Sequence, residues 1–163
     1  MIENAPPVLG NGQRVLAYAV VDDSVRYVGR RLTFVGNGKG ELEELGPVPC
    51  IAITEDFKTG EINLLYCDAQ WEFLAPGGRY DAVAAAKARA EREYQGVSSL
   101  WIESNVSRDE ALKIREEMWA ELRCSFCDKS PLDVEQMIER NGARICDSCV
   151  SRLHKTLNEQ SSE

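Results

Sequence analysis

The stretches Cys124-Ser-Phe-Cys127 and Cys146-Asp-Ser-Cys149 decide how the end of this 163-residue chain can fold. They form a C-x₂-C-x₁₈-C-x₂-C array, in which each C-x-x-C pair places two sulfur atoms on one tight turn. Four thiolates can close a tetrahedral shell with metal–sulfur bonds of about 2.3 Å. Such a shell favours zinc over Mg²⁺ or Ca²⁺. We therefore predict that Cys124, Cys127, Cys146 and Cys149 bind Zn²⁺.

Two disulfides, or reduced pairs that meet by chance, are the alternatives to a metal site. Residues 1–12 are polar and contain proline, unlike the charged start and apolar core of a secretory signal. We therefore expect the chain to stay in the reducing cytosol, where paired cysteines more often hold a metal. No apolar run approaches the roughly 18 residues that span a bilayer, so we expect a soluble, cytoplasmic protein. Cys50 and Cys67 lie in expected strands and are interpreted as small buried apolar side chains.

The net charge of −8 is spread over the chain, with −6 in residues 1–123 and −2 in residues 124–163. Four thiolates around one Zn²⁺ would add a further charge of about −2 to the second part. Because binding to nucleic-acid phosphates requires a basic surface, nucleic acid is not an expected partner. A local basic patch on the zinc module is the exception that the sequence leaves open, formed by Lys129, Arg140, Arg144, Arg152 and Lys155.

Residues 1–105 predict a small α+β domain in which one helix covers an antiparallel sheet. Short segments rich in β-forming residues alternate with turn-forming clusters, and Pro76-Gly-Gly78 is expected to end the strands. Residues 80–94 change to a three- and four-residue apolar period typical of a helix. A last strand is expected in 97–102. The segment Gly36-Asn-Gly-Lys-Gly40 is interpreted as a hairpin connection, since a phosphate-binding loop would need serine or threonine after the lysine.

A helix at residues 106–123 is expected to lead from this domain into a zinc-binding domain at 124–163. Ser107-Arg-Asp-Glu110 has the pattern of a capping box, which marks a helix start. The apolar stripe of this helix can pack on the first domain, on the zinc module or on a second copy of the chain. The sequence leaves these three alternatives open.

Within the zinc module the sequence predicts two further helices. Ser130-Pro-Leu-Asp133 is expected to start the first, and Asn141-Gly142 is expected to end it. A final helix begins near Cys149 and carries Val150, Leu153 and Leu157 at helical spacing. Knuckle, helix, turn, second knuckle and helix describe a treble-clef-like arrangement, in which a metal joins elements too short to form a core unaided.

Residues 122–158 resemble the zinc-binding N-terminal domain of the ClpX unfoldase. The resemblance is carried by Cys124-Ser-Phe-Cys-Asp-Lys-Ser130 and by Ile145-Cys-Asp-Ser-Cys-Val150, and it covers about a quarter of the chain. It implies a treble-clef-like, zinc-stabilised dimer that recruits adaptors and some substrates and does no chemistry. It also implies zinc ligation by the four cysteines of the array. Residues 1–123 resemble no family that we recognise.

Two features depart from the ClpX pattern. In ClpX an ATPase follows the zinc domain, whereas here the zinc module comes last and no Walker motif exists, so ATP-driven unfolding by this chain is excluded. The usual glycine after the first C-x-x-C pair is replaced by Asp128. We expect this aspartate to alter the first knuckle slightly.

A catalytic zinc ion would keep one coordination position for water, and the deaminase pattern adds H-x-E upstream of its cysteines. Neither feature is present in the sequence, and His154, the sole histidine, is expected to face solvent. We therefore predict that the chain is not an enzyme. The expected function is that of a protein-protein interaction or adaptor protein, forming a homodimer or docking a protein such as an unfoldase or protease component.

Two alternatives to this function remain. One is an acidic immunity protein or inhibitor that neutralises a basic toxin through complementary charge. The other is a zinc-dependent nucleic-acid binder or enzyme.

Overall fold

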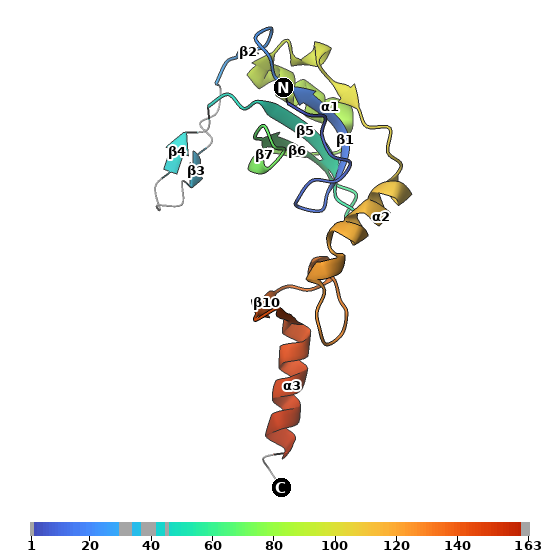
Figure 1. Ribbon diagram of the computed structural model, residues 1–163. Coiled ribbons are helices and arrows are strands. Elements are labelled where there is room, and N and C mark those ends of the chain that lie inside the picture. Colours follow the sequence, from blue (N-terminus) through green and yellow to red (C-terminus); the bar gives the residue numbers. More distant parts are fainter. Residues whose placement is uncertain (1, 30–33, 37–41, 45, 161–163) are drawn as a thin grey trace. The chain divides into compact units, whose positions relative to one another are not determined.

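The computed structural model describes residues 2–29, 34–36, 42–44 and 46–160 (Figure 1). These residues form two compact units, which divide between Leu112 and Lys113. The division falls inside one helix, α2 (Arg108–Met118). The domain boundaries expected at 105/106 and 123/124 stay predictions. Among the described helices, none combines the length and the apolar character that crossing a membrane would require.

The first unit is an α+β fold, as the sequence predicted, and it is built on a five-stranded antiparallel sheet in the order β7-β6-β5-β1-β9. Its elements before α2 are, in chain order, β1 (Arg14–Val20), β2 (Arg26–Tyr27), β3 (Phe34–Gly36), β4 (Leu42–Glu44), β5 (Cys50–Glu55), β6 (Ile62–Cys67), β7 (Phe73–Tyr80), α1 (Val83–Glu93), β8 (Tyr94–Gln95), η1 (Val97–Ser99) and β9 (Ile102–Glu103).

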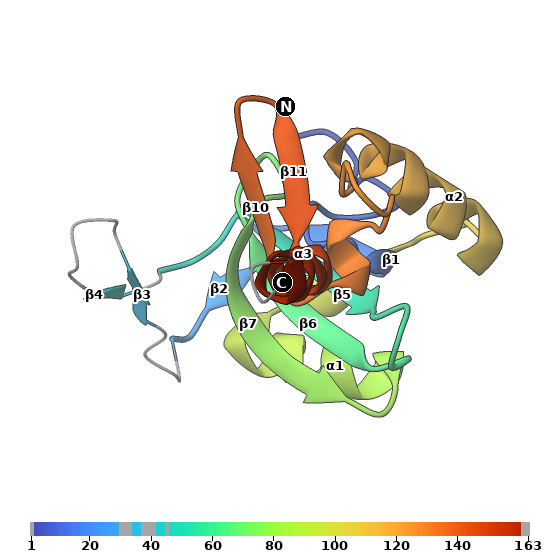
Figure 2. The same cartoon turned by 90° about the horizontal axis from the view of Figure 1, so that it is seen from below.

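Helix α1 covers one face of this sheet (Figures 1 and 2). Ala86 and Ala90 of α1 are fully buried and belong to one apolar cluster with Ile51, Ile53 and Leu64 of the sheet. Alanine has a high helix propensity and a short side chain, so it lets the helix pack closely on the β-branched and leucine side chains. The covering helix predicted at 80–94 is therefore confirmed.

The opposite face of the sheet is also buried, which the sequence did not reveal. Leu9, in the segment before β1, belongs to its cluster and is almost fully buried. Trp71 packs edge-on against Tyr18, with 5.3 Å between ring centroids, and its indole N–H donates a hydrogen bond to the carbonyl oxygen of Glu3 at 2.9 Å. The N-terminal segment thus replaces a second covering helix.

Two fully buried cysteines lie on this second face. Cys50 of β5 and Cys67 of β6 are opposite one another in the strand register. Burial raises the pKa of Cys50 to about 11 and that of Cys67 to about 12. Both side chains therefore stay neutral thiols, as expected for small apolar residues.

Pro76-Gly-Gly78, which was expected to end the strands, lies inside β7. β7 is an edge strand, where the missing N–H of proline is tolerated. The register shifts where Leu64 pairs with Gly78 and Leu65 with Pro76. Gly77 falls in this shift, and a Cβ atom there would lie 2.7 Å from Cγ of Leu64. The glycine therefore permits a close approach of β7 to β6 instead of ending the strand.

The strand prediction at 97–102 is only partly right. The segment predicted as a strand at 97–102 begins as the 3₁₀ turn η1, and its sheet pairing is limited to β9. Gly96, with a φ of 97°, turns the chain at this point. β3 and β4 pair antiparallel, on either side of the Gly36-to-Gly40 connection. Residues 37–41 of that connection lie outside the described residues.

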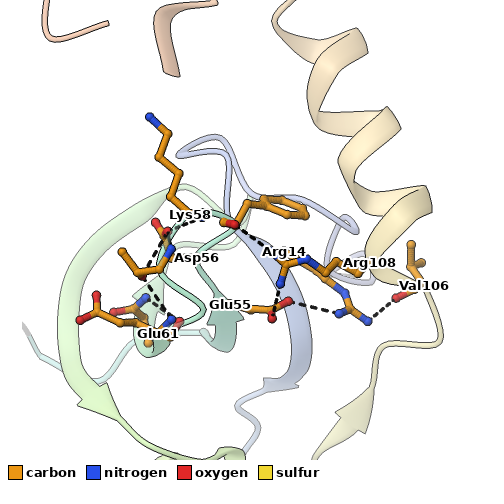
Figure 3. A network of polar contacts seen from close by, with 10 residues as sticks. Arg14, Glu55, Asp56, Lys58, Glu61, Val106 and Arg108 are labelled. Carbon is orange, nitrogen blue, oxygen red and sulfur yellow. Dashed lines mark hydrogen bonds and ion pairs between the residues drawn. The ribbon is translucent and has the colours of Figure 1, made fainter. Parts of the chain in front are cut away.

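The first turn of α2 is fixed by two sets of polar contacts. The backbone N–H of Ser107 donates to the Glu110 carboxylate at 3.0 Å, and the backbone N–H of Glu110 donates to the Ser107 hydroxyl at 3.2 Å. This reciprocal pair confirms the capping box. Near the start of α2, Arg14 and Arg108 both reach the Glu55 carboxylate, with N–O distances of 3.2 and 2.8 Å (Figure 3). Arg14 also donates to the carbonyl oxygen of Val106 at 2.8 Å, so the chain before α2 is bound to the sheet.

Replacing Gly77 by alanine should destabilise the first unit by about 1–3 kcal/mol, because the added methyl group would clash with the packed Leu64 side chain. The measurement is the urea midpoint of the zinc-loaded full chain, followed by circular dichroism. Gly46→Ala is the matched control, since a Cβ at Gly46 meets no atom within 4 Å. Equal losses in the two variants would contradict this account of Gly77.

Candidate metal centre

The second unit holds all four cysteines of the array. Beyond the end of α2, its elements are, in chain order, η2 (Ala120–Leu122), η3 (Pro131–Asp133), β10 (Met137–Arg140), β11 (Ala143–Cys146) and α3 (Asp147–Gln160). Cys124 and Cys127 lie in the turn between η2 and η3, Cys146 ends β11, and Cys149 lies in the first turn of α3.

The first C-x-x-C pair forms a closed knuckle. The N–H of Asp128 donates to the carbonyl oxygen of Cys124, and the N–H of Cys124 donates to the carbonyl oxygen of Lys129, both at 2.9 Å. Asp128 has a φ of 59°, in the left-handed region that glycine adopts at no steric cost. Aspartate is one of the few other residues enriched there, so the knuckle keeps its closed form at this position.

The helix predicted after Ser130 is wrong, because a β-hairpin takes its place. Only η3 is helical in this stretch, and the Ser130 hydroxyl caps it by accepting a hydrogen bond from the N–H of Leu132 at 3.2 Å. β10 and β11 then pair antiparallel across a two-residue turn at Asn141 and Gly142, whose φ values are 53° and 78° (Figure 2). Asn-Gly favours this tight hairpin turn because both positions need positive φ. The knuckle is therefore followed by a hairpin and then by α3, whereas the expected order had a helix in place of the hairpin.

Backbone hydrogen bonds join the first knuckle to the hairpin. The N–H of Ser125 donates to the carbonyl oxygen of Arg144 at 2.8 Å, and the N–H of Arg144 donates to the Ser125 hydroxyl at 3.0 Å. At the other end of the hairpin, the N–H of Asp147 donates to the carbonyl oxygen of Gln136 at 3.1 Å. These bonds bring the two C-x-x-C pairs together.

The four sulfur atoms lie within 4.8 Å of one another. The Sγ atoms of Cys124 and Cys149 are 3.9 Å apart, and those of Cys127 and Cys146 are 3.6 Å apart. In a regular tetrahedron with zinc–sulfur bonds of about 2.3 Å, sulfur atoms are about 3.8 Å apart. The two distances lie on either side of this value, so the cluster has the size of a zinc–thiolate shell.

Electrostatics around the sulfurs favour a bound cation. Burial raises the pKa of the Cys149 thiol, and the neighbouring cysteine sulfurs raise it further. Burial acts in the same direction on Cys124, but backbone N–H groups that point at its sulfur outweigh this effect and lower its pKa. Four thiolates this close together repel one another unless a positive ion compensates their charge. Zn²⁺ supplies that charge when it is bound.

One cysteine of the array accepts a hydrogen bond from a charged side chain of α3. The guanidinium of Arg152 donates to the sulfur of Cys149 at 3.6 Å. A cation in this place both orients the sulfur and reduces the net negative charge of the shell. The sequence singled out Arg152 only as part of a basic patch and did not reveal its contact with the centre, although its position three residues after Cys149 on a predicted helix puts it on the same face.

Comparison with family models decides what kind of module this is. Residues 122–159 match the ClpX C4-type zinc finger. The ClpX-type module therefore covers the knuckle, the hairpin and nearly all of α3, and together with the four-cysteine cluster it implies Zn²⁺ as the bound ion. No solved structure matches the chain.

Apart from Arg152, the other candidate residues are not part of the sulfur cluster. His154 is exposed on α3 and is near Asn158, with 3.1 Å between its Nε2 atom and the side-chain amide. Of the five basic residues considered as a patch, three have acceptors within the module. Arg144 pairs with Glu139 at 3.0 Å, Arg152 contacts Cys149, and Lys155 lies 3.9 Å from Glu159.

The apolar core of the ClpX-type module is very small. Its buried residues are three of the cysteines, and only Cys127, Val134, Met137 and Ile145 pack partly buried against them. Such a core buries too little surface to hold a unit of this length folded. Coordination of the metal therefore has to supply much of the folding free energy.

Removing zinc should unfold the module and leave the sheet unit folded. Purified protein should contain one zinc ion per chain, and a chelator should collapse the dispersed NMR amide signals of residues 124–160. Signals from β1, β5 and β6 are the internal control, because that unit has an apolar core on both faces of its sheet. A module that keeps its dispersed signals after complete metal removal would show that its fold does not depend on the ion.

Arg152→Gln should weaken zinc binding by roughly tenfold, the lower end of the range for loss of a partner that orients a metal ligand. Competition with a chromophoric chelator measures this affinity. Lys155→Gln removes the same charge from the same helix without touching a cysteine, and it should leave the affinity unchanged. Equal weakening in both variants would mean that overall charge, not the contact with Cys149, sets the affinity.

Proposed function

We propose that the ClpX-type module is a noncatalytic, zinc-stabilised docking unit that binds another polypeptide, with a second copy of this chain as its first partner. The observation that carries the proposal is a group of large apolar side chains left exposed on the module. Phe126 is 57% exposed, Ile138 56% and Leu157 62%. Apolar side chains in this number on a unit with so small a core are typical of an interaction surface.

Three of these side chains share one face of α3. Val150, Leu153 and Leu157 are spaced by three and four residues, which places them in one row along the helix. The exposed fractions of Val150 and Leu153 are 40% and 39%. A helix with such a row buries it against a partner of matching apolar character, and an identical helix is the simplest such partner.

The chemistry of the centre supports a structural ion. Four cysteine sulfurs already fill a tetrahedral shell, whereas a catalytic zinc ion needs a position for water or substrate. The partnered state of Arg144, Arg152 and Lys155 also supports a protein partner over a nucleic acid, since much of the positive charge of the module is compensated within it.

Leu153→Glu should shift the protein from dimer to monomer, or weaken the dimer by at least tenfold, because it places a charge in the apolar row of α3. Multi-angle light scattering across a concentration series measures the mass. Ser151→Glu adds the same charge at an exposed position two residues away and should keep the dimer. A wild-type protein that is monomeric at every concentration would reject the second copy as partner.

A further inference from the structure

The four cysteines of the metal centre differ in their access to solvent. Cys124 and Cys149 are 2% exposed and Cys146 is fully buried, whereas Cys127 is only partly buried. Cys127 also follows Phe126, whose ring is exposed. Cys127 is therefore the ligand residue with the greatest access to a reagent from solvent.

The sulfur atoms of the centre also differ in the hydrogen bonds that they accept. The sulfur of Cys124 accepts the N–H of Cys146 at 3.4 Å, and the sulfur of Cys149 accepts the Arg152 guanidinium at 3.6 Å. Hydrogen bonds stabilise a thiolate and lower its intrinsic nucleophilicity. The neighbour of Cys127 in this distance range is another sulfur, that of Cys146 at 3.6 Å. At this distance Cys146 is placed to react with a modified Cys127.

We propose that Cys127 is an oxidation site at which a hydroperoxide, with hydrogen peroxide as the simplest member, opens the zinc centre. In the first step the Cys127 thiolate attacks one peroxide oxygen. A sulfur–oxygen bond forms, the oxygen–oxygen bond breaks, and hydroxide leaves. The sulfur loses two electrons to the peroxide and becomes a sulfenic acid.

In the second step the Cys146 thiolate attacks the sulfenic sulfur. A sulfur–sulfur bond forms, the sulfur–oxygen bond breaks, and a second hydroxide leaves. The sum is two thiolates and one peroxide giving one disulfide and two hydroxide ions. The disulfide would leave Cys124 and Cys149 as the remaining ligands, too few to hold the ion, and a dithiol reductant would regenerate the two thiolates while becoming a disulfide itself.

The chain contains its own control in Cys50 and Cys67. Both are fully buried in the sheet unit, and burial holds their pKa values at about 11 and about 12. They remain unreactive thiols while that unit is folded. Modification of either cysteine would therefore report unfolding rather than a reaction at the metal centre.

The test uses the zinc-loaded full chain and hydrogen peroxide, with a chromophoric chelator that records zinc release. Samples are quenched with N-ethylmaleimide during the reaction and mapped by mass spectrometry. At half release, Cys127 should be the first cysteine oxidised, a Cys127–Cys146 disulfide should follow, and Cys50 and Cys67 should be unmodified. First oxidation at Cys124, Cys146 or Cys149, or peroxide treatment without zinc release, would overturn the proposal.

Two matched variants sharpen the test, because histidine can replace a cysteine as a zinc ligand. Cys127→His removes the accessible thiolate and should slow zinc release by at least tenfold. Cys149→His keeps the Cys127–Cys146 pair and should release zinc within about twofold of the wild-type rate. Equal protection by both variants would overturn the assignment to Cys127. If either variant fails to bind zinc, the mapping of the wild-type chain decides alone.

A loss of docking on oxidation rests on the proposed function. The oxidation site and the docking function can nevertheless be tested separately. Light scattering of the oxidised, zinc-free chain should show loss of the dimer, with recovery after reduction and zinc addition. A chain that is monomeric before oxidation rejects the docking proposal, and zinc release with Cys127 mapping still tests the oxidation site. A dimer that survives zinc release rejects only the loss of docking on oxidation.

Discussion

The cluster of four cysteine sulfurs is the constraint on which the second unit depends. Its elements are a knuckle, two strands of four residues each and one helix. None of these elements buries a substantial apolar surface against the others. Thiolate repulsion would drive the sulfurs apart without a cation, whereas a zinc ion turns the same four groups into the core. The reciprocal hydrogen bonds between Ser125 and Arg144 can then form, because the ion holds the knuckle and the hairpin together.

The sheet unit is held together in a different way. Both faces of its sheet are covered, one by α1 and the other by the N-terminal segment with Trp71, so the usual hydrophobic effect stabilises it. Its polar contacts fix position more than they add energy. Glu55 forms ion pairs with Arg14 of β1 and Arg108 of α2. Because the Glu55 side chain is only 17% exposed, it attracts each guanidinium more strongly than it would at an open surface.

Features that depend on local spacing were predictable from the sequence, and features that depend on distant contacts were not. The cysteine spacing, the capping box of Ser107 and Glu110 and the alanine-rich period of α1 are all local, and the structure contains each of them. The hairpin was missed because Val134, Met137 and Ile138 fit a helical period, while Asn141-Gly142, a strong hairpin turn, was interpreted as a helix end. Burial of Leu9 against Trp71 joins residues far apart in the chain, so no local pattern predicts it.

A fold made by a metal leaves its apolar side chains unused, and this links the stability of the module to its surface. In a domain with a hydrophobic core, residues such as Leu153 and Ile138 would be inside; here coordination does the work of a core, and they stay accessible to a partner. The use of metal coordination in place of a hydrophobic core also has a chemical consequence. Apolar contacts are chemically inert, whereas thiolates are nucleophiles. A fold stabilised by thiolate ligands is therefore lost when its most accessible cysteine reacts. Cys127 has the greatest exposure of the four, so under the proposed oxidation the fold of the module depends on the reduced state of this residue.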